Sequence, residues 1–220
     1  MEAPGGVSPT FWALVCAEPL RDASVLDVGT GQGRIALALA PLCGQVVGID
    51  NDADAIEEAR ARAARAAIPN VQFVVADADD GGEFGALAPA PRLVTAHLFM
   101  SEPLVRQSAA ALPPDGALVV LGFHVDQWKE TGRASRFAYD EDRMRRLLER
   151  HGFEVEHLSV ERDVETFGSV EEALAAAIGL QEKWKSDGRW FRYVKFLEEG
   201  GRTLTRSHLI AKGRLGSARG

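Results

Sequence analysis

The stretch that decides the fold is Val25-Leu26-Asp27-Val28-Gly29-Thr30-Gly31-Gln32-Gly33-Arg34. A short apolar run with one acid leads into three alternating glycines, and the helical pattern 35–39 follows. This order predicts a strand, a tight turn and a helix. Glycine suits such a turn because it adopts positive φ and lets a ligand approach the backbone. We expect N–H groups at the start of the helix to face that ligand.

The spacing of these glycines separates two kinds of nucleotide-binding motif. Dinucleotide-binding proteins carry G-x-G-x-x-G. This chain instead has G-x-G-x-G, with Arg34 in place of the third dinucleotide glycine and Asp27 two residues before Gly29. The stretch resembles motif I of the class I S-adenosylmethionine (SAM)-dependent methyltransferases. The resemblance implies that SAM is the cofactor and that its site includes the following residues: Asp27, Gly29, Thr30, Gly31 and Gly33.

Acidic residues follow the next two predicted strands. Residues 45–50 end in Asp50, 21 positions after Gly29, and residues 71–77 end in Asp77. A carboxylate at Asp50 can accept short, charge-assisted hydrogen bonds from ribose hydroxyl groups, although NAD-binding proteins use an acid in the same way. The resemblance adds Asn51 to the cofactor site. It also implies that Asp77, or else Asp79, meets the adenine amino group, with Ala78 offering its backbone.

Alternating strands and helices define the fold class. Strands are predicted at 25–28, 45–50, 71–77, 93–100, 117–123, 153–160 and 204–212, and helices at 8–19, 35–40, 51–67, 102–112 and 139–151. This alternation predicts an α/β, doubly wound, mostly parallel sheet. Over residues 24–160 and 203–213 it resembles the class I methyltransferase fold, which implies seven strands, an antiparallel last strand and helices on both faces. Ligands of such sheets bind outside the carboxyl ends of the strands.

A long segment separates the last two predicted strands. A hairpin needs only a few residues, whereas residues 161–203 intervene here. Ser169-Val170-Glu171-Glu172 is a capping box that opens a helix to about Lys185, and residues 189–199 form another before Gly200-Gly201. We therefore expect a single domain over 1–220, with a helical insertion at 161–203 that lines the acceptor pocket. The alternatives are a surface elaboration and a homodimer contact.

Composition describes an ordinary globular chain with an uneven charge. The net charge is −7, but residues 1–180 hold 15 basic against 28 acidic residues and residues 181–220 hold 10 against 4. The basic part also carries five aromatic residues: Trp184, Trp190, Phe191, Tyr193 and Phe196. These residues indicate either a nucleic-acid surface or amphipathic helices whose aromatic side chains pack inward.

Features of location point to the cytoplasm. No apolar run approaches the ~20 residues of a membrane span, and the first residues lack the pattern of a signal peptide. The two cysteines, Cys16 and Cys43, show no metal-ligand spacing and predict buried thiols. We expect a cytoplasmic protein that binds no metal and contacts no membrane.

Methyl transfer from SAM is an in-line displacement. Holding the reactants at attack distance can be worth up to ~7–11 kcal/mol, so a catalytic side chain is optional. His97 and His124 are the titratable residues at strand ends. His97 is predicted either as a general base, worth ~10²–10⁴-fold, or as a cofactor neighbour.

The chain has His97-Leu98-Phe99-Met100 where methyltransferases of nucleobase amines often show Asn/Asp-Pro-Pro-aromatic. This apolar strand exit favours a small, partly hydrophobic acceptor.

Four functions follow from these residues. The first is a SAM-dependent methyltransferase with a small-molecule acceptor. The second is an rRNA or tRNA methyltransferase that holds RNA with the basic aromatic segment 183–214. The third is an NAD-dependent oxidoreductase, which Arg34 and the two closing strands argue against. The fourth is a protein that binds SAM without turnover.

Overall fold

The computed structural model describes residues 2–80, 84–87 and 90–216. These residues divide into two compact units. Unit 1 contains Met1–Gly122, Glu141–Ser159 and Ile210–Gly220, and unit 2 contains Phe123–Asp140 and Val160–Leu209. The sequence predicts one domain with an insertion at 161–203. In the structure, the whole of residues 161–203 belongs to unit 2, together with residues 123–140 from the end of the fifth strand onward.

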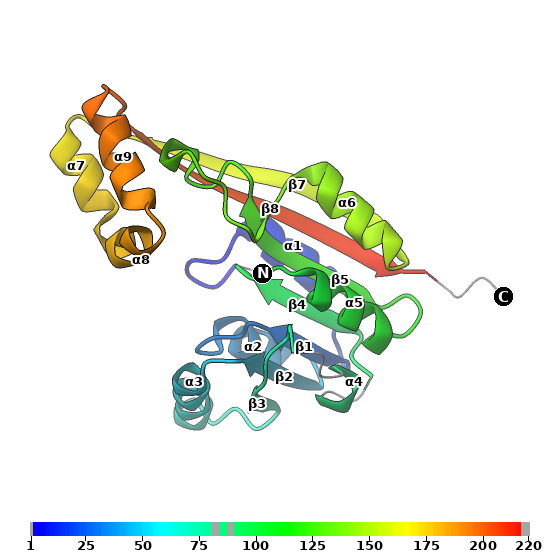
Figure 1. Ribbon diagram of the computed structural model, residues 1–220. Helices are drawn as coiled ribbons and strands as arrows, with labels where there is room; N and C mark the ends of the chain where they lie inside the picture. Colours follow the sequence, from blue (N-terminus) through cyan, green and yellow to red (C-terminus); the bar gives the residue numbers. More distant parts are fainter. Residues whose placement is uncertain (1, 81–83, 88–89, 217–220) are drawn as a thin grey trace. The chain divides into compact units, whose positions relative to one another are not determined.

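The sheet has the predicted class (Figure 1). Its strands are β1 (Ser24–Val28), β2 (Gln45–Asp50), β3 (Val71–Val75), β4 (Leu93–His97), β5 (Ala117–His124), β6 (Ala138–Tyr139), β7 (Phe153–Thr166) and β8 (Thr203–Leu215). They lie in the order β3-β2-β1-β4-β5-β8-β7, with β6 beside β5. Strands β1 to β5 pair in parallel. The order of the strands reverses between β1 and β4: β2 and β3 lie on one side of β1, and β4 and β5 lie on the other. Ligands of such sheets bind at the carboxyl ends of the strands at this switch point.

The helices begin largely where the sequence predicts. They are α1 (Pro9–Cys16), α2 (Arg34–Leu39), α3 (Ala53–Arg65), α4 (Phe84–Leu87), α5 (Glu102–Ala111), α6 (Glu141–Arg150), α7 (Val170–Ala176), α8 (Gln181–Ser186) and α9 (Arg189–Glu198). Ser8 Oγ accepts a hydrogen bond from the Phe11 N–H at the start of α1. Ser101 Oγ accepts one from Leu104 N–H at the start of α5. Such caps satisfy N–H groups that a helix leaves unpaired.

The core of unit 1 joins helices to the central strands. Phe11 of α1, Leu39 of α2 and Ile56 of α3 are fully buried in one apolar cluster with residues of β1, β2 and β4. The β1 and β4 residues from Val25 and Leu93 onward are buried almost throughout. Burial of both faces explains their continuous apolar sequence. This packing fixes the strand ends from which the site is built.

Unit 2 has an aromatic core of its own. Trp184 of α8 and Tyr193 of α9 are fully buried, with ring centroids 5.6 Å apart, and Trp128 lies 5.3 Å from Trp184. The aromatic residues of the basic segment therefore mostly pack inward; Phe191 is the exception, with 67% of its surface exposed.

The predicted single helix from Ser169 to Lys185 is wrong. Helix α7 ends at Ala176 and a 3₁₀ turn at Ile178–Leu180 precedes α8. Gly179 lies in that turn, and glycine is a poor helix former. None of the described helices is long and apolar enough to cross a membrane.

Candidate cofactor site

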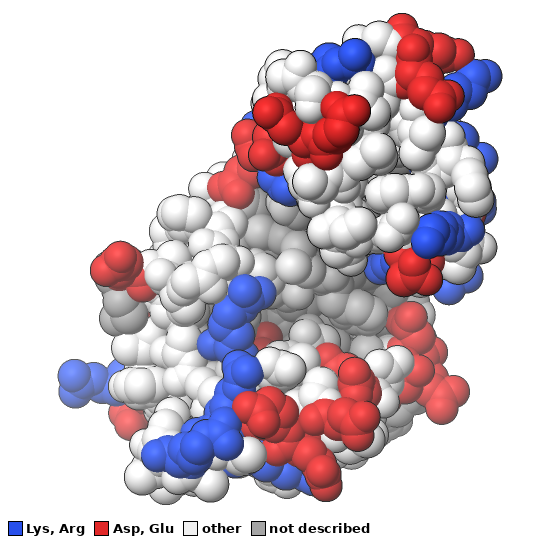
Figure 2. All heavy atoms as spheres, turned by 90° about the vertical axis from the view of Figure 1, so that its left-hand side faces the viewer, with Lys and Arg blue, Asp and Glu red and all other residues white. Residues whose placement is uncertain are grey.

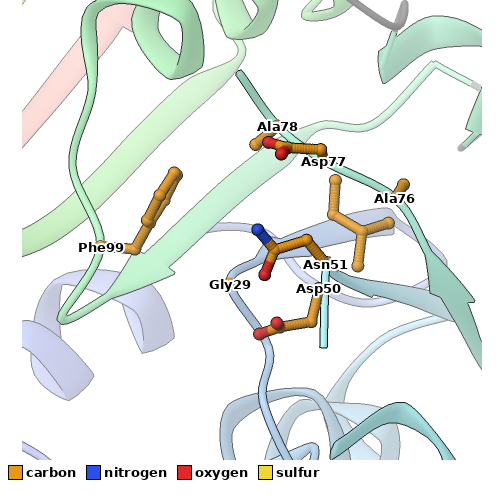
Figure 3. A pocket seen from close by; sticks show the side chains of 8 residues that line it. Gly29, Asp50, Asn51, Ala76, Asp77, Ala78 and Phe99 are labelled. Atoms are coloured by element: carbon orange, nitrogen blue, oxygen red, sulfur yellow. The ribbon is translucent and has the colours of Figure 1, made fainter. Parts of the chain in front are cut away.

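A pocket in unit 1 lies at the carboxyl ends of β1, β2 and β3 (Figure 3). It is lined by Gly29, Ile49, Asp50, Asn51, Ala76, Asp77, Ala78 and Phe99. Five of these residues are ones that the sequence assigns to the cofactor: Gly29, Asp50, Asn51, Asp77 and Ala78. They come from three separate turns, and the parallel sheet brings them to one edge. The remaining predicted residues do not line this pocket.

The three glycines of the turn all adopt positive φ: 68° at Gly29, 52° at Gly31 and 81° at Gly33. A Cβ at Gly29 would lie 3.0 Å from Phe99 Cβ, and one at Gly33 would lie 2.7 Å from the Phe73 ring. A Cβ at Gly31 would meet nothing within 4 Å. Glycine is thus needed at Gly29 and Gly33 for both conformation and space, and at Gly31 for conformation alone.

Three N–H groups of the glycine turn form hydrogen bonds within the protein. Thr30 N–H donates to Ile49 O, Gly33 N–H donates to Thr30 O, and Gly31 N–H donates to Asp50 Oδ2 at 2.7 Å. The Asp50 carboxylate therefore joins the glycine turn to the end of β2. Its Oδ1 accepts from Asp52 N–H at 3.0 Å. Because each carboxylate oxygen has two lone pairs, Asp50 retains capacity for ligand hydroxyl groups.

Asp27 lies inside unit 1 rather than in the pocket. Only 1% of its surface is exposed, and its two oxygens accept hydrogen bonds from Thr30 Oγ1 at 2.6 Å and Thr95 Oγ1 at 2.8 Å. Burial raises the pKa of Asp27 to about 6, and the two hydroxyl groups oppose this change. Asp27 and Thr30 therefore tie β1, the glycine turn and β4 together.

His97 ends β4 but does not line the pocket. Arg34 Nη2 lies 3.4 Å from its Nδ1, and the Phe11 ring meets it edge-on at 5.2 Å between centroids. A guanidinium group only donates hydrogen bonds, so Nδ1 accepts, and the proton of the neutral ring is assigned to Nε2.

The second candidate base, His124, is buried in unit 2. Its Nδ1 accepts from the Asp126 N–H at 3.2 Å and lies 3.1 Å from Ser207 Oγ. These contacts are those of a structural side chain.

Phe99 closes the pocket on the side opposite Asp77 and Ala78 (Figure 3). The sequence suggests Phe99 only as a wall of an acceptor pocket. Its position depends on Leu98, which has φ of 63° and donates its N–H to Leu121 O at 2.7 Å. A left-handed conformation costs a non-glycine residue roughly 1–2 kcal/mol. No glycine, proline or other typical turn residue stands at this bend, so the sequence did not predict it.

Part of the chain that holds these residues is similar to known proteins. Residues 20–84, which include the glycine turn, Asp50 and Asp77, match the model of a methyltransferase domain family. A release factor glutamine methyltransferase from Vibrio cholerae is 54% identical over 56 residues, which are 24% of this chain and 20% of that protein. A 23S rRNA (uracil(1939)-C(5))-methyltransferase from Stenotrophomonas maltophilia is 42% identical over 65 residues, 30% and 15% of the two chains. The matches span no more than a fifth of these relatives.

Solved structures match over nearly the whole chain. The YcgJ protein from Bacillus subtilis superposes with a TM-score of 0.73 at 13% identity, over 95% of this chain and 99% of that one. A phosphoethanolamine N-methyltransferase from Haemonchus contortus, solved with S-adenosylhomocysteine, gives 0.62 at 15% identity over 98% and 54%. The cyclase SpnF gives 0.63 at 22% identity over 94% and 81%. The solved structures thus share the fold of nearly the whole chain, and the family match over residues 20–84 agrees with the class I SAM-dependent methyltransferases that its sequence resembles.

Proposed function

We propose that this chain is a SAM-dependent methyltransferase that acts on a small molecule. The observation that carries the proposal is the meeting of Asp50, Asn51 and Asp77 in one pocket beside the Gly29 turn. Carboxylates at two strand ends suit a molecule with ribose hydroxyl groups and an adenine amino group, because all of these are hydrogen-bond donors. The relatives that match this part of the chain are named methyltransferases.

Each residue of the pocket has a proposed role. Asp50 accepts hydrogen bonds from the ribose, Asp77 and the Ala78 backbone meet the adenine, and Phe99 covers the nucleoside. Gly29 leaves the space that these groups need. SAM supplies the electrophilic methyl group. His97, whose Nδ1 is engaged by Arg34, is proposed to fix the cofactor from the end of β4 rather than to remove a proton.

Two observations favour a small acceptor over RNA. The fully buried Trp184 and Tyr193 are unavailable for stacking on bases, which single-stranded RNA recognition requires. On the face drawn in Figure 2, Asp and Glu side chains gather in several groups, and a band of Lys and Arg side chains lies beside one of these groups. Acidic groups repel the phosphate backbone that dominates RNA affinity. Because one of the relatives is an rRNA methyltransferase, RNA is tested as the alternative acceptor.

Incubation with methyl-labelled SAM tests the proposal. Two acceptor pools are offered, a small-molecule extract and total RNA, with the Asp50→Ala variant as the control for enzyme-dependent transfer. We expect label in the small-molecule fraction only. Label in RNA would overturn the small acceptor. Label in neither pool, with SAM bound, would contradict both acceptor classes.

The proposal also places the enzyme in the cytoplasm. Cys16 and Cys43 are free thiols, and burial raises the pKa of both, to about 11 for Cys43. Such thiols are typical of a reducing compartment. Cell fractionation with an antibody to the chain checks this location, and recovery from an oxidising compartment would contradict it.

A further inference from the structure

Unit 2 contains a pocket of its own, with a volume of about 440 Å³. It is lined by Phe123, Trp128, Arg133, Ala134, Ser135, Arg136, Phe137, Lys183, Asp187 and Arg189. Three aromatic and four basic side chains thus share the wall with a single acid. Small-molecule sites commonly have volumes of roughly 300–1,000 Å³ and combine apolar walls with a few polar groups. This pocket has the size of such a site, and its wall is richer in basic groups.

Arg189 is the polar group that most needs a ligand. Only 9% of its surface is exposed. Its Nε lies 3.1 Å from Asp187 Oδ2 as an ion pair, yet this buried Nε makes no hydrogen bond among the described residues. A buried guanidinium with unmade hydrogen bonds is unfavourable, and an anion would satisfy it. Its planar group of donors suits a carboxylate or phosphate.

Other cations of the wall add to the positive charge. Within the described part of the chain, no carboxylate pairs with Lys183 or with Arg136, whose Cζ lies 4.5 Å from the centre of the Phe137 ring. The single acid, Asp187, is already engaged, since it accepts from Arg189 N–H at 3.1 Å and pairs with the same guanidinium. The pocket therefore carries uncompensated positive charge.

The aromatic side of the pocket is held in a fixed conformation. Trp128 has φ of 57°, which is rare for a bulky residue, and its N–H donates to Thr205 O at 2.9 Å. Its ring lies 5.7 Å from the Phe123 ring and 5.6 Å from Arg189 Cζ. Strained residues of this kind concentrate at binding sites. Trp128 lines the pocket beside the cationic group, with 8% of its surface exposed.

We propose that this pocket binds a small organic anion that has a flat, aromatic body and a carboxylate or phosphate group. Arg189, Lys183 and Arg136 bind the anionic group, and Trp128 and Phe123 contact the aromatic body. The proposal concerns unit 2 alone, so it stands or fails separately from SAM binding in unit 1.

Calorimetric titration with four probes tests this site: benzoate, phenyl phosphate, benzyl alcohol and inorganic phosphate. We expect at least one of the two aromatic anions to bind one site with a Kd below about 1 mM. Benzyl alcohol, which lacks the charge, and inorganic phosphate, which lacks the ring, should each bind at least tenfold more weakly. Equal affinity for benzyl alcohol or inorganic phosphate would overturn the proposed ligand class. So would absence of heat from both aromatic anions up to about 10 mM.

A matched pair of double variants locates the site. Lys183→Gln with Arg136→Gln removes two cations from the pocket wall. Lys185→Gln with Arg206→Gln removes two from the same unit outside it, where they pair with Glu182 and Glu165. We expect the first variant to lower the affinity for the aromatic anion at least tenfold and the second to change it less than twofold. Equal loss in both variants would show general charge attraction and contradict the site. Near-ultraviolet circular dichroism checks that both variants keep the aromatic core.

Discussion

The buried Asp27 carboxyl group makes the free energy of unfolding depend on pH. Its ordinary pKa is 3.8, and burial raises the pKa to about 6 in the folded chain. Between these pH values the unfolded chain releases the proton while the folded chain keeps it. The contribution of Asp27 to the free energy of unfolding therefore falls as the pH rises from about 4 to 6. A difference of two pKa units corresponds to about 3 kcal/mol.

Replacement of Asp27 should remove this dependence. In Asp27→Asn the side chain cannot ionise, so we expect the fall in unfolding free energy between about pH 4 and 6 to become smaller than in the wild type. Urea unfolding at a series of pH values measures it. Parallel curves for the two proteins would contradict the pKa assigned to Asp27.

The glycine turn permits a matched comparison. Gly29 and Gly31 both have positive φ, but only at Gly29 would a Cβ press on Phe99. Both alanine variants should lose about 1 kcal/mol of stability from backbone strain. We expect Gly29→Ala alone to weaken S-adenosylhomocysteine binding at least tenfold, because it displaces a wall of the pocket. Calorimetric titration compares them, and equal affinities would contradict the role given to the Gly29–Phe99 contact.

His97 allows a base to be distinguished from a positioning residue. Because Arg34 engages Nδ1, we expect His97→Ala to raise the KM for SAM and to lower kcat less than about tenfold. The pH profile of kcat should keep its shape. A kcat loss of ~10²-fold or more, with loss of one limb of the pH profile, would instead identify His97 as the general base.

At the scale of elements, an ion network joins β8 to β7 and to the end of α1. Arg214 binds both oxygens of Glu18 and of Glu156, and Lys212 Nζ lies 2.5 Å from Glu18 and 3.0 Å from Glu156. The pKa of Glu156 is lowered to about 2, and the hydrogen bonds from Arg214 are the largest cause. Stability from this carboxylate is present above pH 4.5 and is lost as the pH falls towards 2, opposite to Asp27.

Removal of one member of this network should be costly. The Lys212 side chain is 8% exposed, so Lys212→Met leaves Glu18 with less compensation in a buried place. We expect a loss of about 2–3 kcal/mol, somewhat below that of breaking an isolated buried pair, because Arg214 remains. Lys195→Met, which removes an exposed pair with Glu199, should cost less than about 0.5 kcal/mol. Chemical unfolding at pH 7 compares them, and equal losses would contradict a stabilising network.

Elements that depend on neighbouring residues in the sequence were predictable. Elements that depend on contacts between distant parts of the chain were not. Strand β2 ends at Asp50 as predicted because its apolar run and its terminal acid are adjacent in sequence. The two-residue strand β6 was missed because it depends on pairing with β5. The bend at Leu98, which places Phe99 in the pocket, has no turn residue to mark it. Local patterns thus predicted the acids that line the pocket, Asp50 and Asp77, but not that Phe99 lies across from them.

At the scale of the whole molecule, the boundary of unit 2 also follows from distant contacts. Glu130 accepts hydrogen bonds from the Thr205 N–H and hydroxyl group, at 3.0 and 2.5 Å, and Trp128 packs on Trp184. These partners are more than fifty residues apart in sequence. Hydrophobic periodicity reports only local structure, so the sequence showed the insertion at 161–203 but not the segment that packs with it.

The fold alone does not decide the reaction, since methyltransferases and a cyclase share it. The proposed activity depends on the pocket of unit 1 and on the nucleoside that we propose it binds. Replacement of Asp50 tests nucleoside binding most directly, because Asp50 lines the pocket and accepts a hydrogen bond from the glycine turn.

Calorimetric titration with S-adenosylhomocysteine is the decisive measurement. We expect one site with a Kd of about 1–100 µM, affinity at least tenfold weaker in Asp50→Ala, unchanged affinity in the neighbouring control Asp54→Ala, and no heat with NAD. Absence of heat with S-adenosylhomocysteine from well-folded protein, or full affinity in Asp50→Ala, would contradict the account.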